Sequence, residues 1–225
     1  MHSYSKRAVE SGGEVARKRM SAEQRRESII KATIKVVARL SYDRATTSLI
    51  AKEARINEAL IYSHFKSKQK LQLAMLEYLL EFRLRIYTSN PIFQATDQKR
   101  SIIKAVNEQY MEEIQNPDID MFSCILKALF AIDSEIREKG WSIIKAFQNF
   151  NQQNLEEDIK RGFLKEHIDP DILAWEMLGK VTLISIMAIN GKMDAYDIQK
   201  VKKSMAFFEE LFLRKKPKKN GKSSG

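Results

Sequence analysis

The sequence predicts an all-α protein, with a small N-terminal domain of three helices followed by a larger helical body. The 225-residue chain contains 8 Gly and 4 Pro, which is too few for the many tight turns of an all-β protein. Apolar residues recur at three- and four-residue spacing over long segments, whereas no stretch alternates as a strand does. Hydrophobic residues make up 44% of the chain, which is enough to form a core.

We divide the chain into four parts. Residues 1–20 lack an apolar period and carry scattered charge, so we expect a flexible basic arm. Residues 21–66 form the three-helix domain, with a helix-turn-helix motif at 46–65. Residues 67–213 form the helical body, and residues 214–225 form a basic tail.

The first three helices are predicted from apolar spacing and from N-capping residues. Ser21 and Gln24 form a capping box at the start of the first helix. Thr46 and Asn57 are good N-caps for two short helices. The expected helices span 22–40, 47–54 and 58–64. Two short helices joined by three residues form a helix-turn-helix arrangement.

The body is expected to contain six longer helices. They span 68–88, 98–115, 118–132, 135–164, 170–190 and 195–213. Ser67 caps the first of them, whose apolar residues lie on nearly all sides, which predicts burial between neighbours. Asp169 and Pro170 mark a helix start as N-cap and first-turn residue. Gly140 leaves open whether the helix at 135–164 begins before or after it.

Positive charge is concentrated at the two ends of the sequence. The chain has 39 Lys and Arg against 29 Asp and Glu. Residues 1–70 hold 16 Lys and Arg against seven Asp and Glu, whereas residues 71–213 hold 17 against 22. This asymmetry favours a polyanionic partner, either nucleic acid or an anionic membrane surface. The alternative is that the basic face only keeps the protein soluble.

Cysteine content and hydropathy indicate a soluble cytoplasmic protein. A single cysteine, Cys124, excludes an internal disulfide and a thiolate cluster for zinc, and we expect it to be an inert core residue. The N-terminus lacks the apolar run of a secretory signal. The longest nearly apolar stretch, 181–189, is much shorter than a membrane span.

Residues between 29 and 71 carry a family resemblance. The sharpest part is the string IYSHFKSKQKL at 61–71. It is preceded, in matching order and spacing, by Ile30, Ala32, Val36, Tyr42, Thr46, Ile50, Ala51, Ala54 and Ile56. This stretch resembles the DNA-binding region of the TetR family of bacterial transcription regulators. The rest of the chain is similar to that family only in length and helical layout.

The resemblance implies a ligand-responsive DNA-binding regulator, most often a repressor, that binds a palindromic operator as a homodimer and is released by a small effector. The body at 67–213 would then bind the effector and form the dimer. The implied DNA contacts are Thr46, Thr47 and Ser48 for phosphate, Asn57, Glu58 and Ala59 for bases, and Tyr62, His64 and Lys68 for the backbone. Asn pairs with adenine, and Glu accepts from cytosine N4.

Each implied contact has a structural alternative. Tyr62 could pack on the first helix, His64 could cap its helix end, and Lys68 could be solvated. Two positions depart from the family, because Ser41 and Arg55 stand where it usually has Gly. If Arg55 keeps a left-handed backbone, the cost is about 1–2 kcal/mol; otherwise the turn differs and the second short helix shifts.

Two further sets of residues follow from the body pattern and the resemblance. Apolar residues at three- and four-residue spacing in the last two helices are expected to form the dimer interface: Met177, Val181, Ile184, Ile198, Val201, Met205, Phe208 and Phe212. The alternative is that these seams pack only on their own subunit. The resemblance also implies a pocket for an apolar or amphipathic effector. Its candidate lining residues are aromatic and could equally be ordinary core residues: Tyr110, Phe122, Trp141, Phe147 and Trp175.

Other classes of function find little support. The sequence contains no nucleophile elbow, zinc-spaced His pair or phosphate loop, so we expect neither an enzyme nor a bound metal or cofactor. The main alternative is a helical protein that binds partners or an anionic membrane surface through its basic ends.

Overall fold

A computed structural model describes residues 20–89, 101–115, 120–192 and 194–214 of the chain. Within these ranges the regular structure is helical, apart from an isolated bridge between Leu164 and Leu213. The helices are α1 (Ala22–Arg39), α2 (Thr47–Ala54), α3 (Glu58–His64), α4 (Lys68–Ser89), α5 (Ile102–Gln115), α6 (Asp120–Ala128), α7 (Ser134–Lys160), α8 (Pro170–Ile189) and α9 (Ala195–Phe212). The all-α prediction is confirmed. The predicted arm at 1–19 and tail at 215–225 lie outside the described residues.

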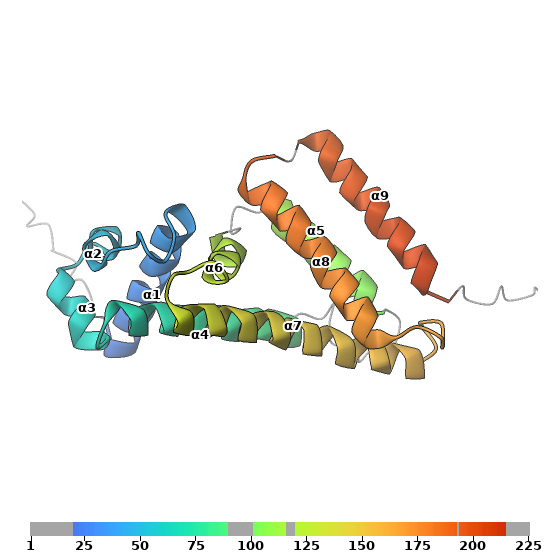
Figure 1. Cartoon of the computed structure of the whole chain (residues 1–225), viewed down its shortest axis with the longest axis horizontal. Helices are drawn as coiled ribbons and strands as arrows, with labels where there is room; N and C mark the ends of the chain where they lie inside the picture. The colour runs from blue at the N-terminus through green and yellow to red at the C-terminus, as the bar shows by residue number, and fades with distance from the viewer. Residues whose placement is uncertain (1–19, 90–100, 116–119, 193, 215–225) are drawn as a thin grey trace, which may run out of the picture.

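The helices divide the molecule along its length (Figure 1). We call α1–α3 the head; it lies at one end. The long helices α4 and α7 run side by side from the head into the body, and α5, α8 and α9 form the far end. The chain therefore places its helix-turn-helix at one tip and its last two helices at the opposite side.

Capping residues start the helices where the sequence predicts. Ser21 Oγ accepts from the amide of Gln24 at 3.1 Å, and Gln24 Oε1 accepts from the amide of Ser21 at 2.9 Å, so the capping box is present. Asp169 Oδ1 accepts from the amide of Asp171 at 2.9 Å at the start of α8, where Pro170 is the first residue. These local hydrogen bonds satisfy amides that the helix itself leaves unpaired.

Gly140 does not start α7 but lies inside it. The helix begins at Ser134, with Asp133 as its N-cap. A Cβ atom at position 140 would lie 2.9 Å from the Cβ of Ala128, so glycine allows α7 to pack closely against the end of α6. The expected helix at 118–132 correspondingly ends at Ala128, and α7 ends at Lys160, before a left-handed Gly162 with φ 74°.

The head and the body share one hydrophobic core. Buried members from both sides of residue 66 are Ile29, Val36, Ile50, Ile61, Leu71, Met75, Cys124, Ile125, Ile143 and Phe147. Tyr42 is buried among them, and its hydroxyl donates to the carbonyl of Cys124 at 3.0 Å. Burial raises the pKa of this phenol well above its usual range. Cys124 is a core residue, as predicted, and its thiol donates to the carbonyl of Ile34.

The predicted dimer seam packs largely inside a single chain. Met177, Ile184, Val201 and Met205 are buried, and Val181, Ile198, Phe208 and Phe212 are partly buried. Most of these side chains join two small cores between α5, α7, α8 and α9. Periodic apolar spacing identified an apolar face correctly, and the protein's own helices bury about half of its residues and cover the others in part.

The opposite faces of α8 and α9 expose other large apolar side chains. Between 44% and 62% of each side chain is exposed in Ile172, Trp175, Leu183, Ile186, Phe207 and Leu211. We call these six residues the outer apolar face. Because α8 is apolar on both faces, an 18-residue window within it reaches a mean hydropathy of 1.7. Among the described helices it alone is long and apolar enough to cross a membrane by length and composition.

Candidate nucleic-acid interface

The two short helices of the head bury one side and expose the other. Ile50 and Ala51 of α2 and Ile61 of α3 are buried, as is Phe65 at the end of α3. These residues belong to the shared core, in which α2 packs on α1 and α3 packs on α2. Tyr62, one residue after the buried Ile61, is half exposed. The arrangement leaves a free front on α3, which is what a recognition helix needs to enter a DNA groove.

The turn between α2 and α3 keeps a left-handed backbone without glycine. Arg55 has φ 54° and ψ 48°, and the amide of Ile56 donates to the carbonyl of Ala51 at 3.0 Å across the turn. Ser41 also has a positive φ, of 137°. Both residues that stand where the family usually has Gly therefore have the positive φ that favours glycine, and Arg55 has the left-handed backbone of the first alternative.

The hydroxyl groups of Thr46 and Thr47, at the start of α2, form hydrogen bonds within the head. Thr46 Oγ1 accepts from the amide of Leu49 at 3.2 Å, as expected of the N-cap. Thr47 Oγ1 hydrogen-bonds to the carboxylate of Glu58 on α3 and lies 3.2 Å from the hydroxyl of Tyr62. Ser48 is exposed. The three residues predicted to contact phosphate are consecutive and lie next to α3, but Thr47 is buried and its hydroxyl is engaged by Glu58.

The base-reading candidates lie at the front of α3. Asn57 Oδ1 accepts from the amide of Ala59 at 2.9 Å and so caps α3. Asn57 and Ala59 are exposed, whereas Glu58 is half buried because it turns toward Thr47. Tyr62 is 52% exposed and is not part of the buried core. The base contacts themselves remain predictions.

Lys68 and Arg26 each link two segments of the head or its border through backbone carbonyls. Lys68 Nζ donates to the carbonyls of Tyr42 and Asp43, each at 3.2 Å, so this predicted phosphate ligand also holds the loop between α1 and α2. Arg26 Nη1 donates to the carbonyl of His64 at 3.2 Å, and its guanidinium lies 4.3 Å from the centre of the Phe65 ring. Arg26 was not predicted from the sequence, because no short-range pattern links residues 38 positions apart.

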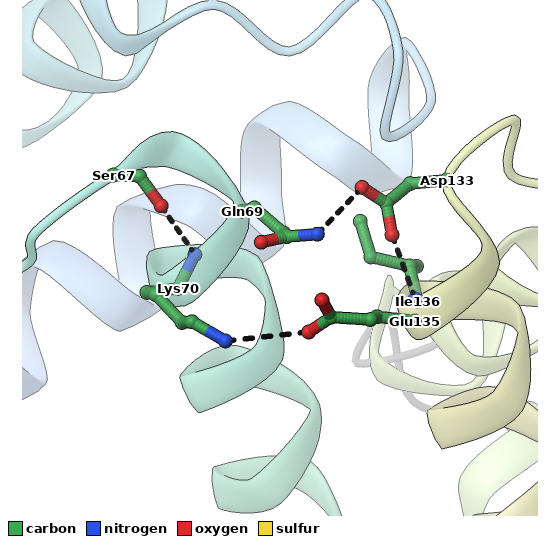
Figure 2. A network of polar contacts seen from close by, with 6 residues as sticks. All are labelled: Ser67, Gln69, Lys70, Asp133, Glu135 and Ile136. Carbon is green, nitrogen blue, oxygen red and sulfur yellow. Dashed lines mark hydrogen bonds and ion pairs between the residues drawn. The ribbon is translucent and has the colours of Figure 1, made fainter.

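A polar joint connects the first turns of α4 and α7 (Figure 2). Gln69 Nε2 donates to Asp133 Oδ2 at 2.8 Å, and Asp133 Oδ1 accepts from the amide of Ile136 at 3.1 Å. Lys70 and Glu135 form an ion pair at 3.3 Å beside them. The amide of Ile136 and the Gln69 side chain hold the pKa of Asp133 below its usual value. One carboxylate thereby fixes the start of α7 to the helix that follows the head.

The five predicted pocket residues do not gather in one place. Tyr110 and Phe147 are buried, but they belong to different cores. The Tyr110 hydroxyl donates to the carbonyl of Val181 at 2.8 Å. Phe122 is partly exposed, and Trp141 and Trp175 are 48% and 45% exposed on α7 and α8. Trp175 instead belongs to the outer apolar face.

Comparison with known proteins agrees with this geometry. Residues 29–75, which span the helix-turn-helix, match the bacterial regulatory proteins of the tetR family. A fatty acid metabolism regulator protein of Bacillus subtilis is 24% identical over 154 residues, which cover 68% of this chain and 77% of that protein.

Two solved structures share the fold. A TetR-family transcriptional regulator from Cytophaga hutchinsonii has a TM-score of 0.70 at 18% identity, over 88% of this chain and all of that one. The regulator FadR from Bacillus subtilis, in complex with stearoyl-CoA, has a TM-score of 0.62 at 22% identity. That match covers 81% of this chain and 96% of FadR.

Proposed function

We propose that this chain, whose N-terminal domain belongs to the tetR family of bacterial regulatory proteins, is a cytoplasmic repressor that binds a palindromic operator as a homodimer. The proposal is supported most by the exposure of α3. Ile61 on one face of this helix is buried, whereas Tyr62 on another face is exposed and its hydroxyl lies next to that of Thr47 on α2. The excess of Lys and Arg in residues 1–70 favours association with the phosphate backbone.

A gel-shift experiment tests sequence-specific binding. The protein is mixed with a duplex from the region upstream of its own gene and, separately, with a scrambled duplex of the same length. We expect a complex with the first at a concentration at least about 1,000-fold lower than with the second. Equal affinity for the two duplexes, together with equal affinity for the other fragments of a genomic library, would refute the proposal.

The dimer is proposed to form through the outer apolar face rather than through the seam predicted from the sequence. On α8, Ile172, Trp175, Gly179, Leu183 and Ile186 follow each other at spacings of three or four and lie on one exposed stripe. A stripe of this kind is complementary to itself, which is what a two-fold interface requires.

Gly179 supports a close helix crossing at this stripe. A Cβ atom built there would have no neighbouring atom within 4 Å, so packing inside the single chain gives no reason for glycine. Glycine in the middle of a helix costs about 0.5–1 kcal/mol relative to alanine. A second α8 crossing over Gly179 would offset this cost, because the missing side chain allows the two backbones to approach.

The effector is proposed to be a long-chain acyl thioester, which is an amphipathic molecule as the sequence analysis expected. The support is the similarity to a fatty acid metabolism regulator and to a FadR structure that holds stearoyl-CoA. The joint between Gln69 and Asp133 provides a route by which a shift of α7 would move α4 and hence the head.

Competition with DNA tests the effector class. Acyl-CoA thioesters of increasing chain length are titrated into a preformed complex with the operator duplex, with free CoA as the control. We expect long-chain thioesters to weaken DNA binding by about 5–150-fold, and CoA alone to have no effect. If no chain length changes the affinity, the acyl thioester is not the effector, whereas the DNA-binding proposal still stands.

A further inference from the structure

Glu58 has an unusual place in the head. It is the first residue of the recognition helix, yet its carboxylate is turned back toward α2, where it accepts the hydrogen bond of Thr47 Oγ1. The Tyr62 hydroxyl lies 3.2 Å from the same Thr47 oxygen. Three side chains from two helices thus form a cluster at the front of the head, which we call the Thr47–Glu58–Tyr62 cluster.

The charge of Glu58 is not used in an ion pair with any Lys, Arg or His of the described ranges. Glu53, on the same domain, behaves differently: it lies 3.9 Å from Lys35 Nζ and 3.8 Å from Arg39 Nη1. The carboxylate of Glu53 therefore stabilises the packing of α1 on α2. Within the described residues, that of Glu58 accepts from the Thr47 hydroxyl, at a surface proposed to face DNA.

We propose that Glu58 sets the general affinity for DNA and does not read a base. Its carboxylate accepts the hydrogen bond of Thr47 Oγ1, and that oxygen lies 3.2 Å from the Tyr62 hydroxyl, so a negative charge stands beside residues predicted to contact phosphate. Because the carboxylate is engaged by Thr47 of α2, it would have to leave this hydrogen bond to turn toward cytosine N4. The inference rests on the proposed DNA-binding function.

The physical consequence is repulsion that is independent of DNA sequence. A carboxylate and a phosphate at about 4 Å in water repel each other by an amount equivalent to about a fivefold change in affinity. Salt screens this repulsion, because the Debye length falls from about 10 Å at 0.1 M to about 3 Å at 1 M. Removing the charge should therefore strengthen binding to every duplex, most of all at low salt.

Fluorescence anisotropy of two labelled duplexes tests the inference. One duplex is selected by the protein from a randomised pool, and the other is its scrambled counterpart. We expect Glu58→Gln to tighten binding to both by the same factor, about fivefold at low salt, with a smaller gain at high salt. Glu58→Ala should do the same. Glu138→Gln, which removes the same charge from an exposed site on α7, should change binding less than twofold.

Two outcomes would overturn the inference. If Glu58→Gln weakens binding to the selected duplex and leaves the scrambled one unchanged, Glu58 reads a base. If neither affinity changes, the carboxylate does not oppose phosphate binding. Wild-type protein that binds both duplexes equally refutes the proposed function instead, and the effect of Glu58→Gln on the scrambled duplex still decides the role of Glu58. Thermal melting followed by circular dichroism verifies that each variant is folded.

Discussion

The head and the outer layer of the body use apolar side chains in opposite ways. In the head, the apolar faces of α1, α2 and α3 meet each other and the helices α4 and α6, so the core is complete within one chain. In the outer layer, α8 and α9 cover their inner faces but leave six large apolar side chains exposed. The difference is what the proposed function requires, with the outer layer completed by a second copy and the head free to meet DNA.

A charge in the outer apolar face is expected to have the largest effect, because it should prevent the dimer from forming. Leu183→Glu places a charge in the middle of the outer apolar face. Leu183 is 61% exposed in one chain, so losing the burial of that part in both copies should cost the dimer about 2–4 kcal/mol. Sedimentation velocity should show a monomer at concentrations where the wild type is a dimer, and operator affinity should fall by about 100-fold or more because the two heads are no longer linked.

Ile132→Glu is the matched control for the outer layer. Ile132 is 80% exposed in the turn between α6 and α7, and it does not belong to the outer apolar face. This variant should remain a dimer. A dimeric Leu183→Glu protein, or a monomeric Ile132→Glu protein, would contradict the proposed interface.

The second prediction concerns a buried carboxylate at the far end of the molecule. Asp158 is 3% exposed, and its Oδ2 accepts from the amide of Ile102 at 2.6 Å. Burial raises its pKa to about 6, although that hydrogen bond and Arg161 oppose the shift. The folded chain therefore binds this proton more tightly than the unfolded chain does. The contribution of Asp158 to stability is highest below about pH 4 and is lost as the pH rises through about 6.

Asp158→Asn should remove this pH dependence, because the amide oxygen still accepts from Ile102 without a charge. We expect the variant to be more stable than the wild type by about 2 kcal/mol at pH 7.5, and by much less at pH 4.5. Urea unfolding at the two pH values measures the difference. A gain of equal size at both values would show that the carboxylate is not titrating in this range.

A smaller effect is expected at the joint between the head and the body. Asp133→Ala removes the N-cap of α7 and the acceptor for Gln69. The lost cap should lower the free energy of unfolding by about 1 kcal/mol. If the joint transmits the effector signal, acyl thioesters should also release the variant from DNA less effectively than the wild type. Glu135→Ala, which breaks only the exposed ion pair with Lys70, should leave the release unchanged.

The smallest effect is expected in the head, where two residues other than glycine have a positive φ. Arg55 and Ser41 hold left-handed backbones that glycine adopts more readily. Arg55→Gly should stabilise the protein by about 1 kcal/mol or less, since glycine also gains freedom in the unfolded chain. Differential scanning calorimetry would show a rise in Tm of a few degrees. A fall in Tm would mean that the Arg55 side chain contributes contacts beyond its backbone.

The head could be predicted almost residue by residue because its determinants are local. Thr46 and Asn57 cap helices within three residues of themselves, and Ile50 and Ile61 mark the buried faces. Comparison with the family pattern marked Arg55 as unusual but left its backbone open, and the structure has it left-handed. What the sequence did not show is the contact between Thr47 and Glu58, which depends on how two helices cross.

The outer layer was harder to predict for a physical reason. The spacing of Met177 and Ile184 correctly indicates an apolar face of α8, but Ile172 and Leu183 form a second one. Periodicity alone does not distinguish a face covered by the same chain from a face covered by another copy. The aromatic residues predicted to line one pocket lie in different places. They were grouped by side-chain type, and side-chain type does not determine which core a residue joins.

The mass of the complex with DNA tests directly whether two chains bind one palindromic duplex. The protein is titrated with a duplex selected from a randomised pool, and the complex is weighed by native mass spectrometry. We predict two chains on one duplex, with the selected sequences forming an inverted repeat whose half-sites lie about one helical turn or more apart. One chain per duplex at saturation, on a site without two-fold symmetry, would contradict the account.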